Sequence, residues 1–280
     1  VGGMALHRSG LVRDLEVLEL LGTDAAWQGG GMGVQEIASR LARDKGQVSR
    51  VCHTLASTGL INRDRLTRKY RLGHHLYALA MRTQEAHLAT LARPALLELM
   101  ASAEESAHLT VLRGGDIMTV HTELAQDPER DDRFDGISLP ALKTASGRAI
   151  LATFTPDEIA AWWEEHGELR MDYPAHPETS PIQLTEVRRL RKTPNSLNSL
   201  AALQKALKTA QKAGFAISDG DLTENIVDAA APVRNAFGIV VGAISVGARK
   251  NRIRDGNIAL GQLVFDSARA LSLRLGWAGT

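Results

Sequence analysis

The sequence contains only one cysteine, Cys52, among its 280 residues. A single thiol excludes a disulfide framework, a multi-cysteine zinc site and an iron–sulfur cluster. No apolar run reaches the roughly 18 residues that a membrane helix requires. The most apolar stretch, residues 236–248, holds three glycines and a serine, which indicates a buried strand. Because the first residues also lack the apolar core of a secretion signal, we expect a cytoplasmic protein with no membrane partner.

Motifs for catalysis, metals and cofactors are equally scarce. No Gly-x-Ser-x-Gly elbow occurs, and Ser146 and Ser245 have no identifiable base. The Gly-x-Gly pieces within residues 29–33 are not followed by the Lys-Ser/Thr pair of a phosphate loop. No two of the nine histidines are three or four residues apart, the spacing that converges on one ion. We therefore expect no metal, no cofactor and no enzymatic activity.

The charge is distributed unevenly, although the net charge is only +1. Residues 1–75 carry 11 Lys and Arg against 7 Asp and Glu, whereas the remainder carries 22 against 25. Between residues 43 and 71, eight basic residues accompany only two acidic ones. Such a basic end on a mildly acidic body favours a polyanionic partner for the first part, although a solvated surface gives the same pattern.

Residues 1–75 show the order of elements of a winged helix-turn-helix. Apolar residues recur every third position over 10–21, which predicts an amphipathic helix, and a glycine-rich connection too permissive for regular structure follows. A short helix over 34–42 precedes a turn in which Asp44 can cap the next helix, about 45–58, and Gly59 closes that helix. Segments 60–63 and 69–72 can pair as a hairpin, the wing.

The second of these helices has the residue types of a DNA-recognition helix. Its apolar side holds Val48, Val51, Cys52 and Leu55, and we interpret Cys52 as a small core residue rather than a redox switch. On the outer side Arg50 can bind guanine and Gln47 adenine through paired hydrogen bonds, whereas the other basic and hydroxyl side chains suit phosphates. The predicted DNA-binding residues are Lys45, Gln47, Ser49, Arg50, His53, Arg65, Arg68 and Lys69.

The rest of the chain alternates between helical and strand-like patterns. A helix over 75–92 is expected to break or restart at Pro94 and to continue to about residue 104. Strands are expected at 107–113, 116–124, 227–233 and 239–246, and helices at 145–153, 156–166, 199–213 and 256–275. Residues 165–198 are polar and interrupted by prolines, so part of them should form a mobile loop.

This succession of features resembles the IclR family of bacterial transcriptional regulators. The resemblance covers about residues 10–276 and is carried by short motifs that are weak alone and specific in this order. They are Ile37-Ala38, Lys45-Gly46-Gln47-Val48-Ser49-Arg50, Lys69-Tyr70-Arg71-Leu72-Gly73, Leu139-Pro140, Thr144-Ala145-Ser146-Gly147-Arg148-Ala149, Thr193-Pro194-Asn195, Gly214-Phe215-Ala216, Ala230-Ala231-Pro232-Val233 and Ala243-Ile244-Ser245-Val246.

The resemblance implies an α+β protein in which a winged helix-turn-helix domain is joined by a helical linker to a GAF-like α/β effector-binding domain. The expected boundaries are 1–75, 76–104 and 105–280. A small-molecule effector, such as an amino acid or a small organic acid, would bind in the third part. Carried over from the family, the effector-binding positions are Ala145, Ser146, Gly147, Ser218, Asp228, Ser245 and Gly247.

Three of these positions depart from what many members of the family carry. Ser218 stands where aspartate is common, Asp228 where cysteine is common and Gly247 where a second serine is common. A carboxylate at residue 228 would repel anions, so our hypothesis is an effector with an ammonium or hydroxyl group rather than a simple dicarboxylate. An Asp228 that faces solvent or pairs with an arginine is an equally valid interpretation.

The expected mechanism uses a dimer or tetramer on double-stranded DNA. Two recognition helices would read half-sites of a palindrome-like operator about one helical turn apart, or a multiple of it. Residues Leu76, Leu79, Ala80 and Leu88 would supply dimer contacts. The alternatives are an enzyme built on the GAF-like domain, which the absence of cysteine there disfavours, and a protein-interaction module, which the polar outer helix face disfavours.

Overall fold

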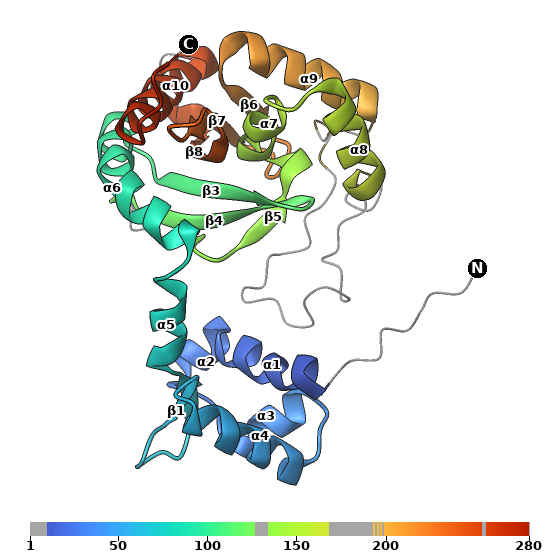
Figure 1. Cartoon of the computed structure of the whole chain (residues 1–280), viewed down its shortest axis with the longest axis vertical. Coiled ribbons are helices and arrows are strands. Elements are labelled where there is room, and N and C mark those ends of the chain that lie inside the picture. The colour runs from blue at the N-terminus through green and yellow to red at the C-terminus, as the bar shows by residue number, and fades with distance from the viewer. Residues whose placement is uncertain are drawn as a thin grey trace, which may run out of the picture. The chain divides into compact units, whose positions relative to one another are not determined.

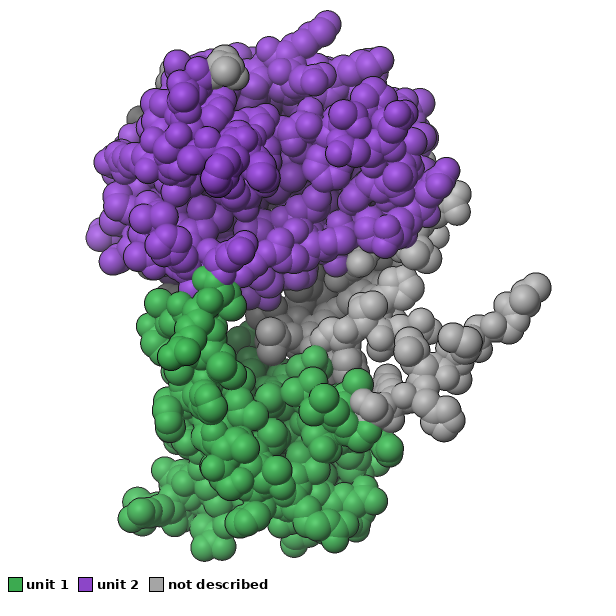
Figure 2. Space-filling view, in the orientation of Figure 1, with its two compact units in different colours: residues 1–83, 175–188 green, residues 84–174, 189–280 purple. Residues whose placement is uncertain are grey.

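The computed structural model describes residues 10–126, 134–167, 193, 195, 197, 199–253 and 256–279. The chain divides into two compact units, with a boundary between Thr83 and Gln84 (Figure 2). Unit 1 contains the described residues 10–83, and unit 2 contains the described residues from 84 onward.

Unit 1 is a small helical domain with one hairpin (Figure 1). Its core includes Val17, Ile37, Val48, Ile61 and Tyr70, which come from different helices and strands and lie in one buried cluster. The elements are α1 (Gly10–Leu21), α2 (Asp24–Gln28), α3 (Val34–Arg40), α4 (Lys45–Ser57), β1 (Ile61–Arg63), β2 (Tyr70–Leu72) and α5 (His74–Ala80).

Both ends of α4 are fixed by the residues that the sequence predicted. The carboxylate of Asp44 accepts a hydrogen bond from the backbone N–H of Gln47 at 3.0 Å, which satisfies a donor in the first turn. At the other end Gly59 adopts φ = 75°, and the N–H of Leu60 reaches back to the carbonyl of Leu55. This left-handed residue after the last turn is the ordinary way for a helix to stop.

The glycine-rich connection is more ordered than its composition predicted. Met32 exchanges two backbone hydrogen bonds with Tyr70, at 3.0 and 2.8 Å, and so adds a third segment beside the wing. Gly31 lies against the backbone of Tyr70 with φ = 102°, a position and conformation that exclude a side chain. The prediction of an irregular connection also missed α2, whose five residues begin at the capping hydroxyl of Thr23.

Unit 2 is built on a six-stranded antiparallel sheet with the order β5-β4-β3-β8-β7-β6. Its helices are α6 (Gln84–Ala103), α7 (Ala145–Leu151), α8 (Pro156–His166), α9 (Leu200–Ala213) and α10 (Gly256–Arg274), with 3₁₀ turns at Ala141–Lys143 and Lys250–Arg252. Its strands are β3 (Ala107–Arg113), β4 (Asp116–Glu123), β5 (Ser138–Pro140), β6 (Ala216–Asp219), β7 (Ile226–Arg234) and β8 (Val240–Arg249).

The two faces of this sheet differ in chemistry. Leu109, Ala229, Val233, Ile244 and Val246 belong to the main apolar core, which α6 and α10 cover (Figure 1). The residues between them on each strand point the other way, because side chains alternate along a strand. There α7 packs on β6, β7 and β8. The arrangement confirms the predicted helix-turn-helix plus α/β domain.

The helix predicted over 75–92 is wrong in its bounds. Helix α5 ends at Ala80, where the hydroxyl of Thr83 donates to the Ala80 carbonyl at 2.7 Å, and α6 begins at Gln84. Pro94 lies inside α6 without breaking it. The buried side chains of Ala92, Leu96 and Leu99 hold this helix on the core, which offsets the backbone hydrogen bond that proline cannot donate.

The predicted strands did not include the short strands β5 and β6, which have three and four residues. The mobile loop expected over 165–198 falls almost entirely outside the described residues.

Candidate nucleic-acid interface and effector site

The outer side of α4 carries the predicted DNA-binding residues of that helix. Val48, Cys52 and Leu55 are buried against the rest of unit 1, so the opposite side of the helix faces solvent. Exposed there are Lys45, Gln47, Ser49, Arg50 and His53. A recognition helix packs on its own domain through its apolar side and places its polar side in the major groove, where the side chains contact base edges. Helix α4 has this division.

Two of the three basic side chains predicted to bind DNA from the wing are exposed to solvent. Arg65 and Arg68 are exposed at the tip of the hairpin. Lys69 is half-buried, and its ammonium donates to the Gly29 carbonyl at 2.7 Å, while Arg71 donates to the Gly30 carbonyl at 2.6 Å. Lys69 therefore also fastens the glycine-rich connection to the wing, a role that the sequence did not indicate.

A concavity of about 690 Å³ lies beside α4 and extends to α1 and the turn between α3 and α4. Arg13, Arg43 and Arg50 all line it. Arg43 contacts the buried carboxylate of Glu16 and the backbone carbonyl of Arg13, so it joins α1 to the turn. Sequence patterns miss this pair, since 27 residues separate the two side chains.

In unit 2, three predicted effector-binding residues form one row across neighbouring strands. Ser218 on β6 pairs with Asp228 on β7, which pairs with Gly247 on β8. Directly paired residues share a face of the sheet, and Ser245, two residues before Gly247, shares it too. This is the face that α7 covers.

The remaining predicted positions, Ala145, Ser146 and Gly147, form the first turn of α7 and are buried. The hydroxyl of Thr144 caps this turn by accepting the N–H of Gly147 at 3.1 Å. Gly147 packs directly against the backbone of Ala141, where a side chain would overlap the carbonyl oxygen. The structure thus brings all seven predicted positions to α7 and the strand face beneath it.

The three departures from the family pattern have distinct surroundings. Ser218 is fully buried, and its hydroxyl donates to the Asp221 carboxylate at 3.0 Å. Asp228 is half-buried, and its Oδ1 lies 2.6 Å from the place where a Cβ of Gly247 would stand. Glycine at 247 therefore makes room for the carboxylate of Asp228.

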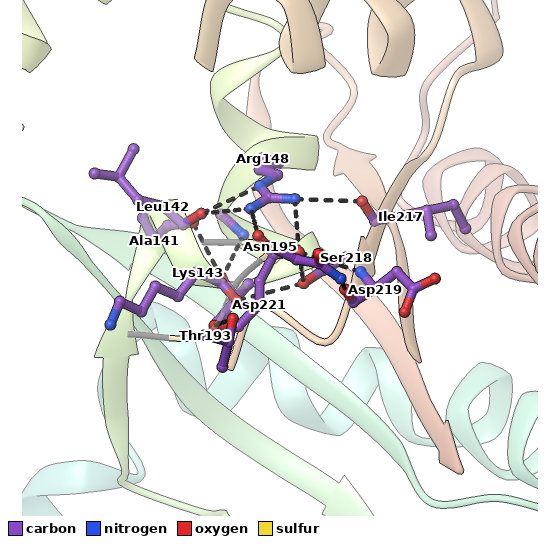
Figure 3. Close-up of polar contacts among 12 residues, drawn as sticks. Ala141, Leu142, Lys143, Arg148, Thr193, Asn195, Ile217, Ser218, Asp219 and Asp221 are labelled. Carbon is purple, nitrogen blue, oxygen red and sulfur yellow. Dashed lines mark hydrogen bonds and ion pairs between the residues drawn. The ribbon is translucent and has the colours of Figure 1, made fainter. Parts of the chain in front are cut away.

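A buried ion pair between Arg148 and Asp221 lies beside these residues and was not predicted (Figure 3). Arg148 donates to Asp221 Oδ2 at 3.2 Å and, from Nε and Nη2, to the Leu142 carbonyl at 3.1 and 3.0 Å. The Asp221 backbone carbonyl accepts from Thr193 at 3.2 Å. The only signal for this pair in the sequence was that Arg148 belongs to the Thr-Ala-Ser-Gly-Arg motif. That motif does not indicate that Asp221 is the partner of Arg148.

Cys52 is buried, which confirms its interpretation as a core residue. Burial raises the pKa of its thiol to about 11, although Arg63 acts in the opposite direction.

Across the described residues, no group of three or more His, Cys, Asp or Glu side chains could hold a metal ion. Nor does any helix in the described ranges have the length and apolarity to cross a membrane.

Comparison with known families agrees with this geometry. The family model for the IclR helix-turn-helix domain matches residues 10–65, and the model for the bacterial transcriptional regulator IclR C-terminal domain matches 80–175 and 171–273. The chain belongs to the IclR family. Like other members, this IclR-family protein is a DNA-binding transcriptional regulator with a C-terminal ligand-binding domain.

Named relatives span nearly the whole chain. The glycerol operon regulatory protein of Streptomyces coelicolor is 28% identical over 276 residues, covering 95% of this chain and 98% of the relative. The HTH-type transcriptional regulator BhcR of Paracoccus denitrificans is 28% identical over 280 residues, covering 97% and 90%. These names describe a non-enzymatic role, which confirms the prediction that the chain is not an enzyme.

Solved structures share the fold. An IclR homolog from Microbacterium hydrocarbonoxydans, complexed with 4-hydroxybenzoate, superposes with a TM-score of 0.75 at 20% identity, covering 95% of this chain and 98% of that one. IclR of Thermotoga maritima superposes with a TM-score of 0.71 at 19% identity, covering 97% and 100%.

Proposed function

We propose that this regulator reads a palindrome-like operator through α4 and that a small-molecule effector on the α7 face of the unit 2 sheet changes its affinity for that operator. The observation that carries the first half is the two-sided α4, with Val48, Cys52 and Leu55 buried opposite an exposed polar stripe. Arg50 and Gln47 specify bases, and Lys45, Ser49, His53, Arg65, Arg68 and Lys69 contact the phosphate backbone.

Two copies of α4 read two half-sites related by two-fold symmetry, as a dimer or as a pair of dimers. Leu79 on α5 is 51% exposed and Ala80 beside it is exposed, which supports this assembly. Leu76 on α5 and Leu88 on α6 are half-buried, and Leu88 also packs against the core of unit 2. In this proposal residues 1–75 bind DNA, 76–104 link the two functions and 105–280 bind the effector, and α6 within the linker also packs on the core of unit 2. Because the partner is DNA, the protein acts in the cytoplasm.

The effector carries an ammonium or hydroxyl group, as in an amino acid or a hydroxylated organic acid. Support comes from Asp228, whose half-buried carboxylate lies on the α7-covered face in the space that Gly247 leaves open. Ligand binding shifts operator affinity only to the extent that it favours one arrangement of the assembly over another.

Selection of bound fragments from the source genome, followed by fluorescence anisotropy at two salt concentrations, tests DNA reading. We expect an enriched palindrome-like site whose affinity falls steeply with salt, because bound phosphates release counterions. Arg50→Ala should weaken binding by about 1–3 kcal/mol for each guanine that Arg50 reads. Binding that shows no enrichment, or enrichment unchanged in Arg50→Ala, contradicts base reading by α4.

Calorimetry with a panel of amino acids, hydroxy acids and dicarboxylates tests the effector class. Wild type should favour ligands with an ammonium or hydroxyl group, and Asp228→Asn, which keeps the shape and removes the charge, should lose that preference. An unchanged order of ligand affinities in Asp228→Asn would exclude this role for the carboxylate.

A further inference from the structure

Several hydrogen bonds close the tip of the wing. Asp64 Oδ1 accepts hydrogen bonds from the N–H of Leu66 at 3.0 Å, the N–H of Thr67 at 2.7 Å and the Thr67 hydroxyl at 2.9 Å. Two backbone hydrogen bonds, from Asp64 to Lys69 and from Arg68 to Asp64, close the loop at 2.9 and 3.1 Å. These hydrogen bonds fix the path of the backbone from which Arg65, Leu66 and Arg68 project.

Leu66 stands at the end of this loop and is 93% exposed, more than any other large apolar side chain among the described residues. It lies in the most basic segment of the chain, between the exposed Arg65 and Arg68. In Figure 1 the loop between β1 and β2 projects outward from the body of unit 1. An apolar side chain offers nothing to a phosphate, so contact with the DNA backbone does not explain a leucine here.

The dimensions and chemistry of this tip fit a minor groove. That groove is about 6 Å wide, and some DNA-binding proteins place β-strands in it. Narrow A·T-rich minor grooves attract arginine through their enhanced negative potential. Apolar side chains such as leucine serve there as wedges against base steps. Arg65, Leu66 and Arg68 combine both features.

We propose that Leu66 is an apolar wedge that enters the minor groove flanking the bases read by α4, with Arg65 and Arg68 on either side, and selects an A·T-rich flank, whose minor groove lacks the 2-amino group of guanine. This inference rests on the proposed reading of DNA by α4. It assigns a specificity-determining role to a residue that makes no hydrogen bond to a base.

The test uses the duplex that wild type enriches from the genome, with the flanking base pairs under the wing changed. Inosine·cytosine has the major-groove edge of G·C but lacks the 2-amino group that fills the G·C minor groove. Wild type should bind A·T and inosine·cytosine flanks alike and G·C flanks on the order of tenfold more weakly, the usual scale for one unfavourable position.

Two variants at the tip separate a wedge from a merely basic wing. Leu66→Ser should weaken binding to the A·T flank and reduce the difference between inosine·cytosine and G·C to the part that Arg65 and Arg68 supply, whereas Leu66→Met should retain both. Because Leu66 is exposed, both variants should unfold at the temperature of wild type.

Equal binding of Leu66→Ser and wild type to every flank would overturn the wedge. Discrimination between inosine·cytosine and G·C that is as large in Leu66→Ser as in wild type would overturn it as well. Arg50→Ala, measured beside them, distinguishes a failure of the wedge from a failure of DNA reading by α4. If Arg50→Ala no longer binds the enriched site and Leu66→Ser binds every flank like wild type, α4 reads the DNA and the wedge is wrong.

Discussion

The guanidinium of Arg148 forms an ion pair with the carboxylate of Asp221, 73 residues further along the chain, and both side chains are buried. The pair joins the first turns of α7 to the end of β6, while Arg148 also holds the Leu142 carbonyl before α7 (Figure 3). Asp221 Oδ2 in turn accepts from the Ser218 hydroxyl at 3.0 Å and from the Asp219 N–H at 3.2 Å. These hydrogen bonds tie together three segments beside the proposed effector site.

Removing one partner of this pair should strongly destabilise unit 2. Arg148→Met leaves the Asp221 carboxylate buried without its counter-charge, and breaking a buried pair in this way costs about 3–5 kcal/mol. Urea unfolding followed by circular dichroism measures the loss of stability. Arg274→Met, which removes the exposed pair with Glu98, is the matched control and should cost no more than about 1 kcal/mol. Similar losses of stability in both variants would contradict the importance of the buried pair.

Gly147→Ala should disrupt the first turn of α7. The added methyl group would overlap the carbonyl of Ala141, which is backbone and cannot rotate away. Overpacking of this kind costs about 1–3 kcal/mol and shifts the backbone. The melting temperature of unit 2 should fall, whereas Gly10→Ala, at a position with nothing within 4 Å, should leave unit 1 unchanged. A wild-type melting temperature in Gly147→Ala would mean that the turn can move freely.

The order of the wing tip should depend on pH through Asp64. The Thr67 N–H, followed by the Thr67 hydroxyl and the Leu66 N–H, holds the pKa of Asp64 below its usual value. A depressed pKa in the folded state means that the tip is ordered above the ordinary aspartate pKa of about 3.9 and loosens as pH falls through the lower, folded value. The amide chemical shifts of Leu66 and Thr67, followed by NMR during acidification, report this transition.

Asp64→Asn supplies the control for that titration, since an amide accepts hydrogen bonds but does not ionise in this range. Its tip should show no transition at the same pH. A midpoint in wild type at or above the ordinary aspartate pKa would contradict the hydrogen-bonded arrangement.

Cys52 should be inert in the native protein. Its thiol is buried, and burial raises its pKa to about 11, so almost no thiolate exists near neutral pH. A thiol-specific dye at pH 8 should react only when urea unfolds unit 1, with a rate that follows the unfolding transition. Rapid labelling of the folded protein would reinstate the redox interpretation that its burial argues against.

The sequence by itself determined the helix-turn-helix and the family. Apolar spacing, the Asp44 cap and Gly59 act within a few residues of one another, so local physics fixes α1, α3 and α4. The positions of Lys45 to His53 on the outer side of α4 follow from the same helical period. The family motifs in unit 2 indicated which segments would surround the proposed effector site, although not how they meet.

Tertiary structure decided what depends on residues far apart in the chain. Arg148 with Asp221, Glu16 with Arg43 and Lys69 with Gly29 are separated by 73, 27 and 40 residues, and no local pattern connects them. Packing also overrode local preference at Pro94, which α6 tolerates because its buried side chains hold the helix on the core. Local spacing specifies elements, whereas burial and the pairing of distant charges determine which elements meet and therefore where the site lies.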